Sequence, residues 1–183
     1  MCRWSGKSRG PGSRDVGVAE FRYRAIGVVH SPYTDPRSMP IQPAGAAGVE
    51  GSVDIDPAYA DGLRDLDGFS HIILLYHFDR AGPTRLVVKP FMDTVEHGVF
   101  ATRAPTRPNP IGLSVVRLLE VDGNRLRIAN VDILNGTPVL DIKPFVPAFD
   151  VFAVERTGWL AGAKDRVRKQ RSDDRFASTD PHD

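Results

Sequence analysis

The sequence has one cysteine, no long apolar run and almost no net charge, and each absence excludes a class of protein. With Cys2 as its only cysteine, the chain offers no internal disulfide and no cysteine-built zinc site, and a reducing cytoplasm fits best. The apolar run Ile72 to Tyr76, closed by a histidine at each end, falls far short of the roughly 18 residues of a membrane span. Basic residues near the N-terminus precede no apolar segment, so we expect no secretory signal. Lys plus Arg total 24 against 23 for Asp plus Glu, which argues neither for nor against a polyanionic partner.

The 183 residues, 41% hydrophobic and 26% charged, predict one ordinary globular core. Residues 1–20 are rich in Gly, Ser and Arg without apolar periodicity, which predicts a flexible basic arm. We expect the folded domain over residues 21–150 and a basic C-terminal extension over 151–183. A proline-rich stretch over 32–51 predicts a long irregular loop, a feature that is commonly functional.

Short β-rich runs dominate the pattern, and Asp122-Gly123-Asn124 is typical of a hairpin turn. Pro57 predicts the start of a small helix. Neither strand-helix alternation nor a Gly-x-Gly-x-x-Gly turn is present, so a parallel dinucleotide-binding sheet is disfavoured. The fold prediction is mainly β: a single-domain antiparallel β-barrel with a few short helices. Strands are expected over residues 21–30, 53–55, 69–78, 86–91, 98–102, 113–121, 126–133 and 139–142, and residues 155–171 are left open between a helix and an irregular tail.

Two clusters carry the candidate chemistry. In Gly98 to Gly112, three prolines stiffen a loop that presents Arg103, Arg107 and Asn109, and guanidiniums four residues apart suit a carboxylate or phosphate. In Asp132 to Pro144, an Asn-Gly turn lies between two carboxylates and can present backbone groups to a ligand. The alternatives are a surface corner for the first cluster and a plain hairpin for the second.

These two clusters, with Ile26 to Tyr33 and Gly68 to His71, resemble in sequence and order the TsaA-like family of TrmO-type tRNA methyltransferases. The resemblance implies a β-barrel, typically dimeric, that uses S-adenosylmethionine to methylate N6 of threonylcarbamoyladenosine at position 37 of tRNA. It covers about residues 21–150. It also implies cofactor-binding positions, which in this sequence are Gln42, Pro43, Asp79, Arg80, Arg103, Leu113, Asp132, Leu134, Asn135 and Gly136.

The acceptor nitrogen implied by the family is urea-like, so its attack on a methyl group would be assisted by a base. We hypothesise that Asp132 or Asp141 has that role, because both carboxylates flank the turn that resembles the cofactor site. Arg107 and Asn109 are candidates for binding RNA. Bacterial members often carry a further C-terminal domain, and we expect a basic run to supply phosphate contacts in its place: Lys164, Arg166, Arg168, Lys169 and Arg171. On this expectation, deleting residues 164–183 weakens tRNA binding and leaves cofactor binding intact; the alternative is a solvated tail.

The histidines predict no metal site. His71 and His77 share a strand face, but six residues on a strand span roughly 20 Å, too far to share one ion. The remaining expectations are a cytoplasmic homodimer with tRNA as its partner and no membrane contact. The alternatives in function are a methyltransferase of the same family acting on another RNA adenosine or a small molecule, and a barrel that binds RNA or adenosine without turnover.

Overall fold

The computed structural model describes residues 19–37, 39–162 and 170–177. Nearly all of the predicted N-terminal arm, residues 1–20, lies outside the described residues. The same holds for four of the five basic residues expected to bind phosphates: Lys164, Arg166, Arg168 and Lys169.

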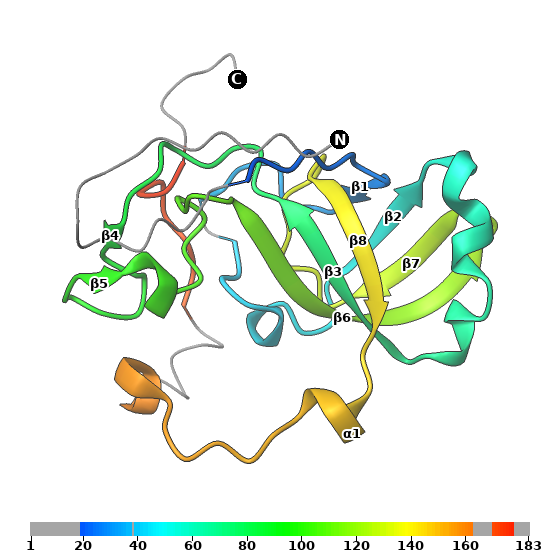
Figure 1. Ribbon diagram of the computed structural model, residues 1–183. Coiled ribbons are helices and arrows are strands. Elements are labelled where there is room, and N and C mark those ends of the chain that lie inside the picture. Colours follow the sequence, from blue (N-terminus) through cyan, green and yellow to red (C-terminus); the bar gives the residue numbers. More distant parts are fainter. Residues whose placement is uncertain (1–18, 38, 163–169, 178–183) are drawn as a thin grey trace.

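Six strands form a closed barrel in the order β1-β2-β7-β6-β3-β8, and every neighbouring pair is antiparallel. Figure 1 shows the long strand β6 curving across the barrel beside β3 and β7. The prediction of a mainly β, antiparallel barrel is confirmed. The strands are β1 (Gly27–His30), β2 (Glu50–Ile55), β3 (His71–His77), β6 (Ile111–Asp122), β7 (Arg125–Ala129) and β8 (Pro138–Pro144).

Side chains that alternate along each strand fill the barrel. Ile72, Leu74 and Tyr76 of β3 point inward and are buried, as are Val116 and Leu118 of β6. This period-two pattern places apolar residues on one face of the sheet, where their removal from water stabilises the closed form. The same buried core cluster also contains Val29, Val53, Ile55, Leu63, Leu126, Ile128, Val131, Ile133 and Val139, of which Leu63 comes from η2 and Val131 and Ile133 follow β7.

A smaller lobe stands beside the barrel, where β4 (Val87–Val88) pairs with β5 (His97–Gly98). It has its own apolar cluster of Val88, Val99, Ala104 and Phe176, with Phe91 packed against it. The helices are short: η1 (Pro43–Gly45), η2 (Pro57–Leu63), η3 (Leu66–Gly68), η4 (Val99–Ala101), α1 (Pro147–Asp150) and η5 (Gly158–Gly162). Within the described ranges, no helix is long and apolar enough to span a membrane.

The predicted strand over 98–102 is wrong. The chain turns there as helix η4, because the backbone N–H and the hydroxyl of Thr102 both donate to the Val99 carbonyl, at 3.0 and 2.8 Å. The strand expected over 86–91 is reduced to β4, which ends two residues before Pro90, a residue without a backbone donor.

The other strand boundaries differ less from the predicted ones. The strand expected over 126–133 ends at Ala129, because Asn130 adopts a left-handed backbone with φ 65°. The first strand begins at Gly27, later than expected. The hairpin at Asp122-Gly123-Asn124 is confirmed between β6 and β7, and Pro57 does begin a helix, η2. In the region left open over 155–171, the described part holds only η5.

Candidate active site

A cavity of about 720 Å³ opens between one end of the barrel and the smaller lobe. Its barrel side is made by the end of β3, the start of β6 and the segment after β7, which the antiparallel pairing brings to the same end. Its far side is made by the loop that follows η4 and by residues near the C-terminus. A cavity of this size is in the range of small-molecule and cofactor sites.

The Asp132 side chain takes part in a buried chain of hydrogen bonds at this cavity. Ser114 donates its hydroxyl to Oδ1 of Asp132 at 2.7 Å. The Ser114 hydroxyl also lies 3.1 Å from the Tyr76 hydroxyl. Ser114 and Tyr76 are 1% and 5% exposed inside the barrel, so neither can exchange its partner for bulk water. Asp132 itself lines the cavity, and its carboxylate is therefore both fixed and accessible to a ligand.

Burial controls the ionisation of this group. Desolvation raises the pKa of the Asp132 carboxyl to about 6, against the lowering effects of the Ser114 hydrogen bond and the Arg103 charge. Burial and the nearby Asp132 charge raise the pKa of Tyr76 as well, so this phenol stays protonated. Asp132 is consequently a carboxylate at neutral pH, yet basic enough to accept a proton.

The raised pKa of Asp132 makes stability depend on pH. Between its ordinary pKa near 4 and its folded value of about 6, the folded state binds the proton more tightly, so stability falls as pH rises through this window. An Asp132→Asn variant does not titrate there. Compared with the wild type, we expect its free energy of unfolding to be larger by on the order of 2 kcal/mol at pH 8. The difference should shrink toward pH 4, which denaturant unfolding at both pH values measures; a difference independent of pH contradicts the assignment.

Three arginines also line the cavity. Arg103 donates to the Gln42 side chain at 3.0 Å, which ties the stiff loop to the long proline-rich loop. Arg80 donates to the carbonyls of Thr34 and Asn135 at 3.2 and 2.9 Å. Arg107 also lines the cavity. The cavity that holds the Asp132 carboxylate is therefore lined by three guanidinium groups, together with the carboxylates of Asp79 and Asp173.

The turn at Asn135-Gly136 does not line the cavity, but it holds the adjoining segment in place. The side-chain oxygen of Asn135 accepts the Ser31 N–H at 3.2 Å, and the backbone N–H of Asn135 donates to the Tyr33 carbonyl at 2.7 Å. Gly136 has φ +88°, a left-handed conformation that favours glycine, and donates to the Val29 carbonyl at 2.8 Å. The turn thus joins β1 to the segment that carries Asp132.

Most of the residues predicted to bind cofactor meet at this one cavity. Those that line it are Gln42, Asp79, Arg80, Arg103, Leu113, Asp132 and Leu134. Pro43, Asn135 and Gly136 are not among the lining residues and lie in the adjoining helix η1 and the turn. Of the residues predicted to bind RNA, Arg107 lines the cavity, Asn109 is exposed outside it, and Arg171 lies near Tyr33.

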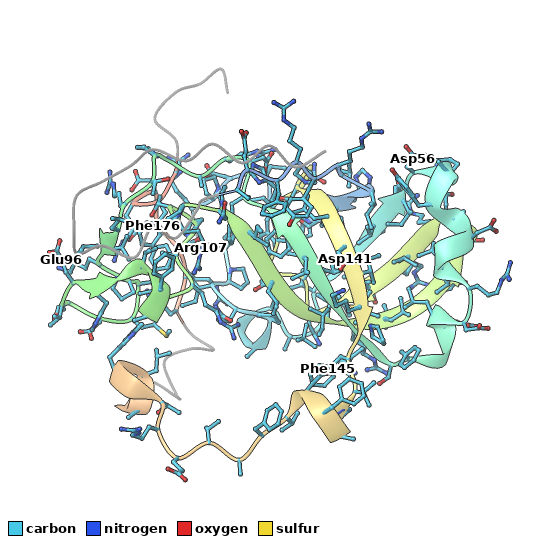
Figure 2. The ribbon with its side chains drawn as sticks, in the orientation of Figure 1. Asp56, Glu96, Arg107, Asp141, Phe145 and Phe176 are labelled. Atoms are coloured by element: carbon cyan, nitrogen blue, oxygen red, sulfur yellow. The ribbon has the colours of Figure 1, made fainter. Side chains whose placement is uncertain are left out.

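The second candidate carboxylate lies elsewhere. Asp141 is on β8, is about half exposed, and pairs with Lys143 at 2.7 Å. Figure 2 shows it apart from Arg107 and Phe176, which both line the cavity. The role of Asp141 as a base stays a prediction that the cavity does not support.

Several residues at the site were missed. Ser114 shares the inward face of β6 with Val116 and Leu118, and a hydroxyl in an apolar register is a signal that a functional partner is near. Tyr76 has the same position on β3. Trp159 of η5 and Phe176 near the C-terminus also line the cavity. In the described part of the chain, no three acidic, histidine or cysteine side chains form a group that could hold a metal ion.

Comparison with known proteins gives the family. Residues 28–151 match the model of the tRNA-methyltransferase O N-terminal domain. The chain belongs to this family. The predicted resemblance to TrmO-type proteins is therefore confirmed, and the match contains every strand of the barrel except the first residue of β1.

Individual relatives agree with this family. The chain is 56% identical, over 85% of each sequence, to a probable S-adenosyl-L-methionine-binding protein of Pyrococcus abyssi. It is 39% identical to the tRNA (adenine(37)-N6)-methyltransferase of Escherichia coli, over 71% of this chain and 60% of that enzyme. A crystal structure of TrmO superposes with a TM-score of 0.65 and 40% identity, covering 76% of this chain and 64% of the other. The chain thus spans less than two thirds of these last two proteins.

Proposed function

We propose that this protein is an S-adenosylmethionine-dependent tRNA methyltransferase that methylates N6 of threonylcarbamoyladenosine at position 37. The observation that carries the proposal is the fixed Asp132 carboxylate, faced by arginines in a cavity large enough for a cofactor. Family membership and relatives named as S-adenosylmethionine-binding proteins and as a tRNA (adenine(37)-N6)-methyltransferase support it.

The residues at the cavity fit the chemistry of this cofactor. Guanidinium groups, here Arg103 and Arg80, bind carboxylates, while Leu113 and Leu134 offer apolar surface to a nucleobase. Gln42 would complete the polar side of the site. When bound, S-adenosylmethionine supplies a methyl group activated by its positively charged sulfur.

The chain itself contributes orientation and a base. We assign to Asp132 the removal of the proton from the acceptor nitrogen, because its pKa of about 6 leaves it ionised at neutral pH and able to accept that proton. The Ser114 hydroxyl holds the carboxylate in one position. Apolar side chains around the cavity exclude water and keep the reacting groups aligned.

For tRNA, we propose phosphate contacts from Arg107 and Arg171, with further contacts from Asn109 and from the basic run at 164–169. An Arg107→Ala variant should bind tRNA more weakly, and the slope of log affinity against log salt should fall by about 1, because one phosphate contact is lost. Filter binding over a range of salt concentrations measures both values.

Arg64→Ala is the matched control for this substitution. Arg64 is exposed, directly follows η2 and is not among the residues that line the cavity. Figure 1 shows the segment of η2 on the opposite side of the barrel from the β4–β5 lobe. The control substitution should leave tRNA affinity and salt slope at the wild-type values. Equal slopes for Arg107→Ala and the wild type would remove Arg107 from the RNA-binding surface.

We also propose that the protein acts in the cytoplasm as a homodimer. Four apolar side chains on and after α1 are 61% to 75% exposed, and a second copy would bury them. They are Phe149, Val151, Phe152 and Val154.

Transfer of labelled methyl groups tests the proposed function. The protein is incubated with methyl-labelled S-adenosylmethionine and with tRNA prepared with or without the threonylcarbamoyl group at adenosine 37. Label in the modified tRNA alone supports the proposal. Label in both tRNAs favours another RNA adenosine, and cofactor binding without transfer favours a small-molecule acceptor or a binding module.

A further inference from the structure

We propose that residues 170–177, here called the C-terminal strap, form part of the cofactor-binding wall and determine how tightly the cofactor is held. This inference rests on the proposed function. The matched family domain ends at residue 151, so the strap lies outside it. Nevertheless Ser172, Asp173, Phe176 and Ala177 of the strap line the cavity.

The first half of the strap is fastened to the long proline-rich loop. The Ser172 N–H donates to the Met39 carbonyl at 3.0 Å, and the Met39 N–H donates to the Ser172 hydroxyl at 3.1 Å. That hydroxyl donates its single proton to the Pro36 carbonyl, and the Met39 carbonyl lies 3.2 Å from it as an alternative acceptor. The loop fastened in this way carries Gln42, the partner of Arg103.

The second half is fastened to the smaller lobe. Phe176 is 7% exposed in the cluster with Val88 and Val99, and its ring meets the Phe91 ring edge-on at 5.1 Å. The guanidinium carbon of Arg175 lies 4.9 Å from the centroid of the same Phe91 ring, and Arg175 donates to the Pro90 carbonyl at 3.1 Å. The Phe176 carbonyl accepts the Gly82 N–H at 2.9 Å.

The strap therefore joins two loops that both contribute to the cavity. One carries Gln42, and the other, between β3 and β4, carries Asp79 and Arg80. Figure 1 shows the strap, in red, running beside the β4–β5 lobe. Since it both lines the cavity and fixes these two loops, losing either attachment should loosen the binding site without opening the barrel.

This changes the expectation for removing residues 164–183. From the sequence, the deletion should affect only tRNA binding. Because the deletion includes the strap, we now expect it to weaken cofactor binding as well.

Two substitutions in the full-length protein test the strap, one at each attachment. Ser172→Ala removes the hydrogen bonds that the Ser172 hydroxyl makes to the proline-rich loop and leaves the bond of its backbone N–H. Phe176→Ala removes the aromatic anchor from the smaller lobe. We expect each substitution to raise the dissociation constant for S-adenosylmethionine roughly tenfold in calorimetric titrations. A tenfold change corresponds to a loss of about 1.4 kcal/mol in binding free energy. Binding of tRNA without cofactor should not change in Phe176→Ala, which leaves the attachment beside Arg171 in place, and Phe21→Ala, at an exposed phenylalanine, should match the wild type.

The barrel core is separate from the cluster around Phe176, so thermal unfolding followed by circular dichroism should show a folded barrel in both variants. Wild-type affinity in either folded variant overturns the strap proposal. So does the opposite pattern, with weaker tRNA binding and unchanged cofactor affinity. A wild-type protein that does not bind S-adenosylmethionine overturns the proposed function instead.

Discussion

An Asp132→Asn protein should transfer methyl groups about 10²–10⁴-fold more slowly than the wild type in single turnovers, the range that loss of a general base produces. The Ser114 hydroxyl can still donate to the amide oxygen, so the fold and the cavity should persist. Cofactor affinity should therefore change little while the rate falls. Rapid-quench measurements at saturating cofactor, with affinity from calorimetry, separate these effects.

The pH dependence of the single-turnover rate is a second test of the role of Asp132. In the wild type the single-turnover rate should rise with pH through about 6 and level off above it, as the Asp132 carboxyl loses its proton. In Asp132→Asn this rise should be absent. A wild-type rate that does not vary between pH 5 and pH 8 would contradict the role of Asp132.

Asp141→Asn is the matched substitution at the other candidate carboxylate. Since Asp141 pairs with Lys143 on β8 and does not line the cavity, the rate should stay at the wild-type value. Loss of transfer in Asp141→Asn, with Asp132→Asn fully active, would move the base to Asp141.

A Gly112→Ala substitution should have the second large effect, because it changes the packing under the site. A Cβ at position 112 would overlap three ring atoms of Tyr76, the farthest of them at 2.7 Å. Tyr76 is 5% exposed, so its ring can only shift against packed neighbours or toward the cavity that it lines. We expect a loss of about 1–3 kcal/mol in the free energy of unfolding from overpacking. We also expect a loss of about 10²-fold in rate, as Tyr76 displaces Ser114 and the carboxylate.

The control for this substitution is Gly98→Ala, at the other end of the same motif. A Cβ there meets nothing within 4 Å, and its backbone has an ordinary negative φ of −58°. Denaturant unfolding and single-turnover rates should both match the wild type. Equal stability of Gly112→Ala and Gly98→Ala would show that Tyr76 is not held as described.

The sequence predicts the barrel well because its strands follow local rules. Alternation in 71–77 and the turn at Gly123 are both visible in a short window. The error at 98–102 arose because Val99 and Phe100 have strand propensity, whereas the turn depends on two bonds from Thr102. A side chain that closes a turn through its hydroxyl gives no periodic signal.

The site was predictable where it lies in motifs and not where it depends on contacts distant in the chain. Arg103 and Asp132 lie in recognisable clusters, and both line the cavity. The link from Asp132 to Ser114 joins residues 18 apart, and the strap meets Met39 across 133 residues. Such contacts are set by the closure of the barrel and the return of the chain, which no short segment encodes.

The most direct test is mass spectrometry of nucleosides from tRNA incubated with the purified protein and isotopically methyl-labelled S-adenosylmethionine. The account predicts labelled N6-methyl-threonylcarbamoyladenosine, formed only in tRNA that already carries threonylcarbamoyl at adenosine 37, and formed about 10²–10⁴-fold more slowly by Asp132→Asn. No labelled nucleoside from a protein that binds the cofactor, while a control methyltransferase modifies the same tRNA, would contradict it.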